Sequence, residues 1–263
     1  MNEDELLQKI TEAVAQCGEI IIDADRTQAG IDEKAGHANF VTAYDKRVQK
    51  ELEKKLLAIL PEAVFVGEEE DIHASIEKGY AFIVDPIDGT TNFIKDYHIS
   101  MISVGLTLDG AQYMGIVYNP YLKEMFTAVK GKGAFLNGKA IQVSKEPLSN
   151  GVVLFGTSPY YKELSKRSFA LAYQYFDKAL DIRRSGSSAF DLCSVAAGRA
   201  EVFFELMLSP WDYAAGSLIV EEAGGKVTTA EGMPITLQKG CSVIATNAVC
   251  YAECAKYMSE CNV

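Results

Sequence analysis

The spacing of apolar residues predicts two helices in the first quarter of the chain. Apolar side chains recur at helical spacing over residues 3–22 and again over residues 45–60, where Pro61 ends the pattern. The intervening residues 27–39 are rich in glycine, alanine and charge, which predicts a loop. That loop contains Lys34.

Short apolar runs with strand character follow the second helix. Residues 63–66 and 81–84 each end at acidic residues, as strands do when they carry side chains to a site. The Asp-Gly and Asn-Gly pairs that come later in the chain are hairpin turn signals. They predict an antiparallel meander of strands over residues 99–108, 111–118, 124–129 and 134–143.

From about residue 148 the pattern alternates between strands and helices. The predicted strands cover residues 152–155, 180–184, 201–206 and 241–246. The predicted helices cover residues 161–176, 188–197 and 212–223, and one more helix ends the chain. This order predicts an α+β or α/β fold of stacked helix and sheet layers. We expect two firmly packed lobes, residues 1–147 and 148–263.

Composition and charge narrow the class of protein. The 263 residues are 48% hydrophobic and 23% charged, as in globular proteins with a sizeable core. A net charge of −11 argues against nonspecific binding to nucleic acid. No apolar run is long enough to span a membrane, and the acidic N-terminus is unlike a signal peptide. We therefore expect a cytoplasmic protein whose six cysteines are reduced.

The segment D-P-I-D-G-T-T-N-F, residues 85–93, carries the first candidate chemistry. An apolar strand leads directly into Asp85 and Asp88, whose carboxylates, with the Ile87 carbonyl, suit divalent cations. Pro86 fixes one backbone angle, and Gly89 permits a close approach to a ligand. Taken alone, the segment favours a simpler interpretation, an ordinary Asp-Gly turn after a strand.

Two further acidic positions change that balance. Glu68 lies in an acidic run after another apolar strand, where a solvated loop is the simpler interpretation. Asp212 lies in P-W-D-Y-A-A-G where a helix should begin, and its simpler role is an N-cap. Because neighbouring strands place their ends together, we predict that Glu68 and Asp85 share one site.

Together these segments resemble the inositol monophosphatase family, part of a superfamily of lithium-sensitive, magnesium-dependent phosphatases. The resemblance runs from N-F-V-T at residues 39–42 to E-E-A-G-G at residues 221–225. It implies a layered αβαβα sandwich of the sugar-phosphatase type and magnesium-dependent hydrolysis of inositol monophosphate. It also implies a homodimer and inhibition by lithium.

The resemblance assigns metal ligands to residues of this chain. Glu68, Asp85 and the Ile87 carbonyl would hold a first magnesium ion. Asp85, Asp88 and Asp212 would hold a second, and Glu68 would also help to hold a weaker third. Several cations are needed because a phosphate dianion repels a hydroxide nucleophile.

The resemblance also assigns the groups around the phosphate. Backbone N–H groups of Gly89 and Thr90 would bind it, while Asp45 and Thr90 would orient the attacking water, with Glu68 close by. Lys34 lies in the loop that closes over the metals in the family, although a solvated lysine is the simpler interpretation. No phosphoenzyme is expected, because these motifs place no serine, histidine or cysteine as a nucleophile. The three histidines, His37, His73 and His98, are interpreted as surface or structural residues.

Substrate selection depends on less specific positions. Glu205 lies where inositol-specific members carry a glutamate that accepts a substrate hydroxyl, but an ion pair with Arg183 is an equal alternative. Gly186, Ser187 and Ser188 align with a polar segment beside the sugar ring. Asp88 and Asp212 complete the predicted substrate contacts.

Two alternatives to inositol monophosphate remain open. A phosphatase for 3'-phosphoadenosine 5'-phosphate or fructose 1,6-bisphosphate would need an extra basic or aromatic subsite, for which Arg167, Arg183 and Arg184 are the candidates. A regulatory binding protein is an alternative of another class, because some bacterial relatives contact the transcription machinery. The complete set of carboxylates argues against an inactive enzyme.

Overall fold

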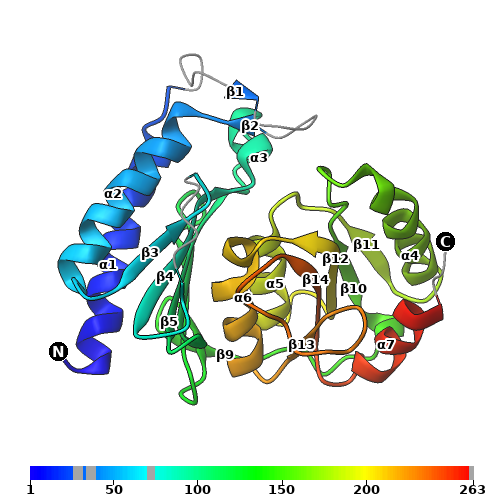
Figure 1. Ribbon diagram of the computed structural model, residues 1–263. Coiled ribbons are helices and arrows are strands. Elements are labelled where there is room, and N and C mark those ends of the chain that lie inside the picture. The colour runs from blue at the N-terminus through cyan, green and yellow to red at the C-terminus, as the bar shows by residue number, and fades with distance from the viewer. Residues whose placement is uncertain (26–31, 34–39, 70–74, 261–263) are drawn as a thin grey trace.

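A computed structural model describes residues 1–25, 32–33, 40–69 and 75–260 of the chain. Helices and sheets alternate in five layers (Figure 1), which confirms the predicted αβαβα sandwich. The helices are α1 (Glu3–Ile22), α2 (Ala43–Ile59), α3 (Thr90–Ile94), α4 (Ser165–Phe176), α5 (Ser188–Ala196), α6 (Pro210–Glu222) and α7 (Tyr251–Glu260). None of the helices in this described part is long and apolar enough to cross a bilayer.

The first sheet contains seven strands in chain order, and the predicted meander is confirmed. They are β3 (Val64–Gly67), β4 (Tyr80–Asp88), β5 (Met101–Leu108), β6 (Ala111–Asn119), β7 (Glu124–Val129), β8 (Ala134–Leu136) and β9 (Lys139–Ile141). Only the β3–β4 pair among these is parallel. The strand predicted over residues 134–143 is a hairpin instead, because Asn137 and Gly138 both take positive φ angles at its turn.

The second sheet is mixed and has five strands. In spatial order they are β11 (Asp181–Arg183), β10 (Val152–Phe155), β12 (Val202–Leu208), β14 (Cys241–Thr246) and β13 (Lys226–Thr228). A separate antiparallel pair joins β1 (Asp32–Glu33) to β2 (Phe40–Val41), so two residues of the predicted loop are extended. The pattern missed three short elements, α3, β13 and this pair, because each is too short to show a period.

Apolar clusters fill the spaces between the layers, and three of them are large. The first lies between the helix pair α1–α2 and the first sheet and includes Ile10, Leu52 and Phe82. The second lies between the two sheets, around α5 and α6, and includes Phe203. The third lies beneath α4 and α7 and includes Phe204. Phe203 and Phe204 therefore point to opposite faces of β12, as successive strand residues do.

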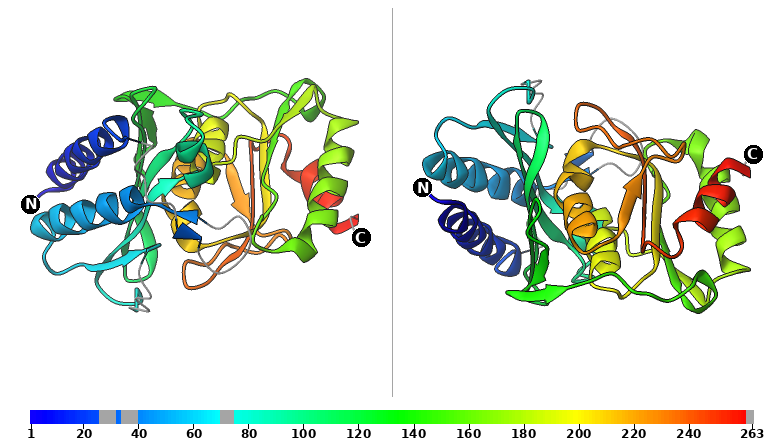
Figure 2. Two further views of the ribbon diagram at one scale, coloured as in Figure 1. Left: turned by 90° about the horizontal axis from the view of Figure 1, so that it is seen from above. Right: turned by 90° about the horizontal axis from the view of Figure 1, so that it is seen from below.

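Figure 2 shows α1 and α2 side by side on the outer face of the first sheet, with α5 and α6 between the sheets. Helix α2 begins with a capping box, in which Thr42 is the N-cap and Asp45 is the third helical residue. The Thr42 N–H donates to Asp45 Oδ2 over 2.7 Å. This local pairing fixes Asp45, a predicted site residue, in the first turn of the helix.

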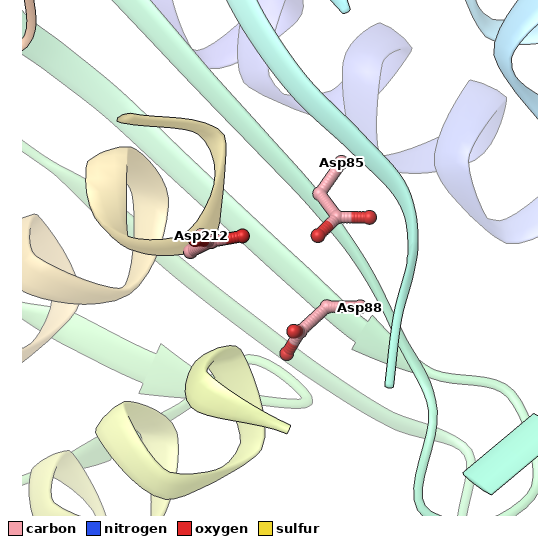
Figure 3. A group of neighbouring side chains, drawn as sticks. All are labelled: Asp85, Asp88 and Asp212. Carbon is pink, nitrogen blue, oxygen red and sulfur yellow. The ribbon is translucent and has the colours of Figure 1, made fainter. Parts of the chain in front are cut away.

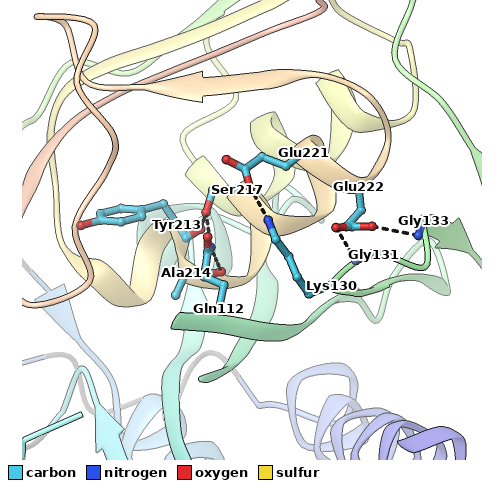
Figure 4. Close-up of polar contacts among 9 residues, drawn as sticks. All are labelled: Gln112, Lys130, Gly131, Gly133, Tyr213, Ala214, Ser217, Glu221 and Glu222. Atoms are coloured by element: carbon cyan, nitrogen blue, oxygen red, sulfur yellow. Dashed lines mark hydrogen bonds and ion pairs between the residues drawn. The ribbon is translucent and has the colours of Figure 1, made fainter. Parts of the chain in front are cut away.

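Helix α6 packs closely on the first sheet although it belongs to the second half of the chain. A Cβ on Gly115 would lie 2.6 Å from the Ala215 carbonyl oxygen, so glycine is required for this approach. The Gln112 carboxamide donates to the Ala214 carbonyl and to Ser217 Oγ, both over 2.7 Å (Figure 4). Contacts of this kind hold α6 against the sheet, and they also fix the position of its N-terminal end.

The C-terminal end of α6 is held in the same way (Figure 4). The Glu222 carboxylate accepts hydrogen bonds from the N–H groups of Gly131 and Gly133, and Lys130 pairs with Glu221. The strands of the first sheet come from the first predicted lobe and those of the second sheet from the other. The division into two lobes at residue 147 stays a prediction.

Candidate active site

Three carboxylates from two distant segments meet at one edge of the first sheet. Asp85 and Asp88 lie at the end of β4, and Asp212 lies at the start of α6 (Figure 3). One oxygen from each lies within 4.8 Å of the others. Asp85 is 2% exposed and Asp88 is 8% exposed. The structure thus brings together three of the four carboxylates predicted to bind metal.

Local hydrogen bonds fix the first two of these carboxylates. The pairing of β4 with β5 is irregular between Asp85 and Asp88, and this irregularity separates the two side chains from the regular strand. The Ile87 N–H donates to Asp85 Oδ1 over 3.0 Å. Asp88 Oδ2 accepts from the Ala189 N–H over 2.7 Å and from the Ser187 hydroxyl.

Asp212 is held at the helix start, but it is not the N-cap that its sequence position suggested. Ser209 is the N-cap of α6 and Pro210 the first helical residue, so Asp212 is the third. The Ser209 N–H donates to Asp212 Oδ2 over 2.7 Å, one half of a capping box. The other carboxylate oxygen is thereby left to the cluster.

The electrostatics of the cluster call for positive charge. Burial, and then the charges of Glu68 and Asp88, hold the pKa of Asp85 well above its ordinary range. Burial also raises the pKa of Asp88 to about 6. The pKa of Asp212 is raised by burial and then by Asp88. Buried carboxylates that repel one another are the donor set of hard divalent cations, so these residues fit a metal site.

Glu68 joins the same cavity from the neighbouring strand. It follows β3, and its N–H donates to the Val84 carbonyl over 3.1 Å. It lines a cavity of about 680 Å³ together with Asp85, Asp88 and Asp212. The prediction that the strand ends near Glu68 and Asp85 meet is therefore confirmed.

Asp45 and Thr90, the predicted water-orienting pair, are in contact. The Thr90 hydroxyl donates to Asp45 Oδ1 over 3.2 Å and lies 3.3 Å from the Ile87 carbonyl oxygen. Asp45 is fully buried, and burial raises its pKa to about 6, with hydrogen bonds from Thr42 opposing the shift. A buried carboxylate with a pKa close to neutral suits a general base.

The predicted phosphate and ring segments lie on the same cavity. Gly89, Thr90, Gly186, Ser187 and Ser188 all line it. Gly89 has a φ of 91° where β4 turns into α3, and a Cβ there would lie 2.9 Å from the Ile99 carbonyl oxygen. Only glycine adopts this backbone shape without strain.

Glu205 lines the cavity from the second sheet, and the alternative pairing with Arg183 is wrong. Arg183 pairs with Asp181 over 2.5 Å instead. Glu205 Oε1 accepts from the Ser158 N–H over 2.7 Å. Burial raises the Glu205 pKa to about 7, while this hydrogen bond and the charge of Arg184 lower it. The nearby arginine is thus Arg184, which also lines the cavity.

Several cavity residues were not predicted from the sequence. Ser158 has a φ of 44°, an uncommon conformation for a non-glycine residue, and its Oγ accepts from the Met207 N–H over 3.0 Å. Tyr160 and Asp191 also line the cavity. These three lie in segments without a recognisable motif, so nothing in the sequence marked them. Asn92 lies within the D-P-I-D-G-T-T-N-F motif, but the resemblance assigns it no role.

Other predicted residues lie elsewhere. His98 is on the surface, stacked on Tyr121 with 4.7 Å between ring centroids, as its structural interpretation predicted. Lys34, His37 and His73 fall outside the described residues. Arg167 donates to the Met258 carbonyl in α7, and therefore lies with the outer layer of the second sheet.

A cluster of buried and half-buried carboxylates beside a hydrogen-bonded Asp–Thr pair suits a metal-dependent hydrolytic site, and this cluster lies on a sugar-phosphatase fold. Comparison with known proteins agrees, because the model of the Inositol monophosphatase family matches residues 2–262. The chain belongs to this family. Membership supports a phosphatase role, and phosphatases of this family depend on metal ions.

Individual relatives cover nearly the whole chain. Inositol monophosphatase 2 of Solanum lycopersicum is 38% identical over 253 residues, 93% of this chain and 94% of its own length. Nus factor SuhB of Escherichia coli strain K12 is 33% identical over 229 residues, 86% of each chain. The crystal structure of the extragenic suppressor protein SuhB from Bartonella henselae has a TM-score of 0.91 at 30% identity, covering 97% of this chain and 99% of its own.

Proposed function

We propose that this protein hydrolyses an inositol monophosphate to inositol and phosphate, with magnesium as its cofactor. The observation that carries the proposal is the cluster of Asp85, Asp88 and Asp212 within 4.8 Å, beside the Asp45–Thr90 pair. Glu205, which lines the same cavity from the second sheet, supports a polyol as the alcohol, because a carboxylate accepts hydrogen bonds from hydroxyl groups.

The metal ligands in this proposal are Glu68, Asp85, the Ile87 carbonyl, Asp88 and Asp212, arranged for two ions and a weaker third. Magnesium prefers oxygen ligands, and all of these supply oxygen. When bound, it supplies positive charge that neutralises a phosphate dianion and lowers the pKa of a water molecule. The charge of the bound cation would then lower the pKa values of these carboxylates, which are raised without the metal.

The chain's own residues orient the reacting groups. Gly89 and Thr90 present backbone N–H groups to the phosphate at the turn into α3. The Thr90 hydroxyl, which donates to Asp45, has lone pairs left to accept a hydrogen bond from the attacking water. Asp45 then takes the proton through that hydroxyl. Asp88 and Asp212, beside Ser188, border the leaving alcohol oxygen, which receives a proton from water.

Residues from the second half of the chain recognise the ring. Glu205 accepts a ring hydroxyl, and the polar turn Gly186–Ser188 lies beside the ring. A nucleotide or sugar bisphosphate is the alternative substrate, with Arg184 as the cavity-lining cation that would meet a second phosphate. Arg167 and Arg183 do not support that alternative, because one contacts α7 and the other pairs with Asp181.

A magnesium-dependent substrate panel tests the proposal. Inositol 1-phosphate should be hydrolysed faster than 3'-phosphoadenosine 5'-phosphate and fructose 1,6-bisphosphate, and chelation should abolish turnover. Lithium should inhibit it, and sedimentation should give a homodimer, as the family resemblance implies. Faster hydrolysis of either bisphosphate would reject the choice of substrate while leaving the phosphatase assignment intact.

A regulatory role is the second candidate, because several relatives carry the name Nus factor SuhB. Asp88→Asn separates the two roles. It should abolish phosphatase activity while the protein still folds. If a transcription complex retains this variant as well as it retains the wild type, a binding role exists beside catalysis. Retained phosphatase activity would instead contradict the assignment of metal ligands.

A further inference from the structure

The side chain of Asn92 connects the two turns that border the cavity. Its Nδ2 donates to the Ile99 carbonyl over 2.7 Å and to the Ser185 carbonyl over 3.0 Å. The second bond joins residues 93 positions apart in the chain. Asn92 is 8% exposed. Both hydrogens of the carboxamide are thus used within the protein, so the group has no donor left for a substrate.

The carboxamide also fills the space between two glycines. Gly186 has a φ of 85°, and a Cβ on it would lie 3.2 Å from Asn92 Oδ1. A Cβ on Gly89 would lie 3.3 Å from Asn92 Nδ2 and 3.3 Å from the Gly186 carbonyl oxygen. The Gly89 turn, the Gly186 turn and Asn92 are therefore in mutual contact, with no room for a larger residue at either glycine.

The opposite side of the Gly186 turn is held by Asp88. This carboxylate accepts from the Ser187 hydroxyl and from the Ala189 N–H at the start of α5. Residues 88–92 thus hold the turn at both ends, through Asp88 at one side and Asn92 at the other. Asp88 also belongs to the carboxylate cluster, whereas the Asn92 carboxamide donates only to backbone carbonyls.

We infer that Asn92 is a positioning residue that fixes the ring-binding turn Gly186–Ser188 relative to the phosphate-binding turn at Gly89. The inference rests on the proposed function, in which one turn borders the ring and the other binds the phosphate. Since small displacements of a bound substrate lower the rate of its reaction strongly, the relative placement of the two turns controls turnover of substrates that use both.

The test compares two substrates in the same preparations of Asn92→Ala and Asn92→Ser. Inositol 1-phosphate uses both turns, whereas 4-nitrophenyl phosphate has no hydroxyl group to place against the Gly186 turn. The ratio of kcat/KM for the first substrate to that for the second should fall about tenfold, the size expected for one lost positioning contact. The ratio is independent of the fraction of active protein. Inhibition by inorganic phosphate should stay within about twofold of wild type.

Ser100→Ala is the matched control on the phosphate side. The buried Ser100 hydroxyl donates to the Gly89 carbonyl over 3.2 Å. Its loss should lower kcat/KM for both substrates in parallel and leave their ratio within about twofold of wild type. The inference would be overturned if kcat/KM of an Asn92 variant fell in parallel for both substrates or changed for neither. It would also be overturned if the variant failed to fold.

Wild-type kinetics keep the inference separate from the proposed function. If the wild-type protein does not hydrolyse inositol 1-phosphate, the proposed substrate is wrong. The same ratio is then measured with the best ring-bearing phosphate of the panel, and a fall in that ratio still supports the role of Asn92. If inositol 1-phosphate is the substrate and the ratio is unchanged, the inference alone fails.

Discussion

The two ends of the cavity are built in different ways. At the phosphate end, Asp85, Asp88, Gly89 and Thr90 lie within one short segment, in which the Ile87 N–H donates to Asp85 and the Ile87 carbonyl accepts from Thr90. At the ring end, Glu205 depends on a bond to Ser158, 47 residues away. The phosphate end is therefore defined by residue type, whereas the ring end is defined by how distant backbone segments meet.

The largest effect is expected from a substitution that disrupts the phosphate end alone. Asp85→Asn should lower kcat/KM by about 1,000-fold or more for every phosphate monoester, because it removes one negative ligand from the cluster. The amide oxygen can still accept from the Ile87 N–H, so the turn should persist. In chelator, the melting temperature should equal or exceed that of wild type, because a buried repelling charge is gone. Activity within about tenfold of wild type would contradict the ligand assignment.

The next effect is confined to the ring end. Glu205→Gln should lower kcat/KM for inositol 1-phosphate about tenfold, mainly through KM, because an amide is a weaker acceptor than a carboxylate. The glutamine oxygen can keep the bond to the Ser158 N–H. Hydrolysis of 4-nitrophenyl phosphate should change less than about twofold. Equal losses on both substrates would mean that the two ends are not separable.

Metal removal gives a third test, in which pH should change stability. Burial raises the pKa of Asp45 and of Asp88 to about 6 and that of Glu205 to about 7. Between their ordinary values near 4 and these raised values, the folded protein binds more protons than the unfolded chain, so stability falls as pH rises. In chelator, the melting temperature should be higher at pH 5.5 than at pH 7.5 by about 3 °C or more.

Saturating magnesium should reduce this pH dependence, because the cations stabilise the ionised carboxylates of the phosphate end. Thermal unfolding in magnesium and in chelator, at both pH values, measures the difference directly. A chelated protein that is more stable at pH 7.5 than at pH 5.5 would contradict the raised pKa values of these buried carboxylates.

The smallest effect separates two neighbouring arginines. Arg183→Ala should change turnover of any substrate by less than about twofold, because its guanidinium pairs with Asp181 outside the cavity. Arg184→Ala is the comparison, since Arg184 lines the cavity and its charge acts on Glu205. If Arg183→Ala lowers hydrolysis of a bisphosphate selectively, the ring end has a second anion site that the described contacts do not indicate.

The same contrast explains what the sequence could predict. The stacking of helix and sheet layers followed from apolar periodicity, whereas the grouping of Asp85, Asp88 and Asp212 followed from the family resemblance that their motifs carry. The positive φ of Ser158 and the influence of the Arg184 charge, rather than that of Arg183, on Glu205 could not be read in the same way. They depend on which segments the folded chain brings together, and neighbours along the chain do not specify that.

Asp45 and Asp212 share one structural feature with a further consequence, since each is the third residue of its helix and bonds to the N–H of the residue that caps it. The position at which each helix starts therefore also determines the direction in which its carboxylate points. One residue inserted between Ser209 and Asp212 would rotate the acid by about 100° around the helix axis and remove the cap together. The position of the Asp212 carboxylate therefore cannot be adjusted gradually by lengthening the loop before α6.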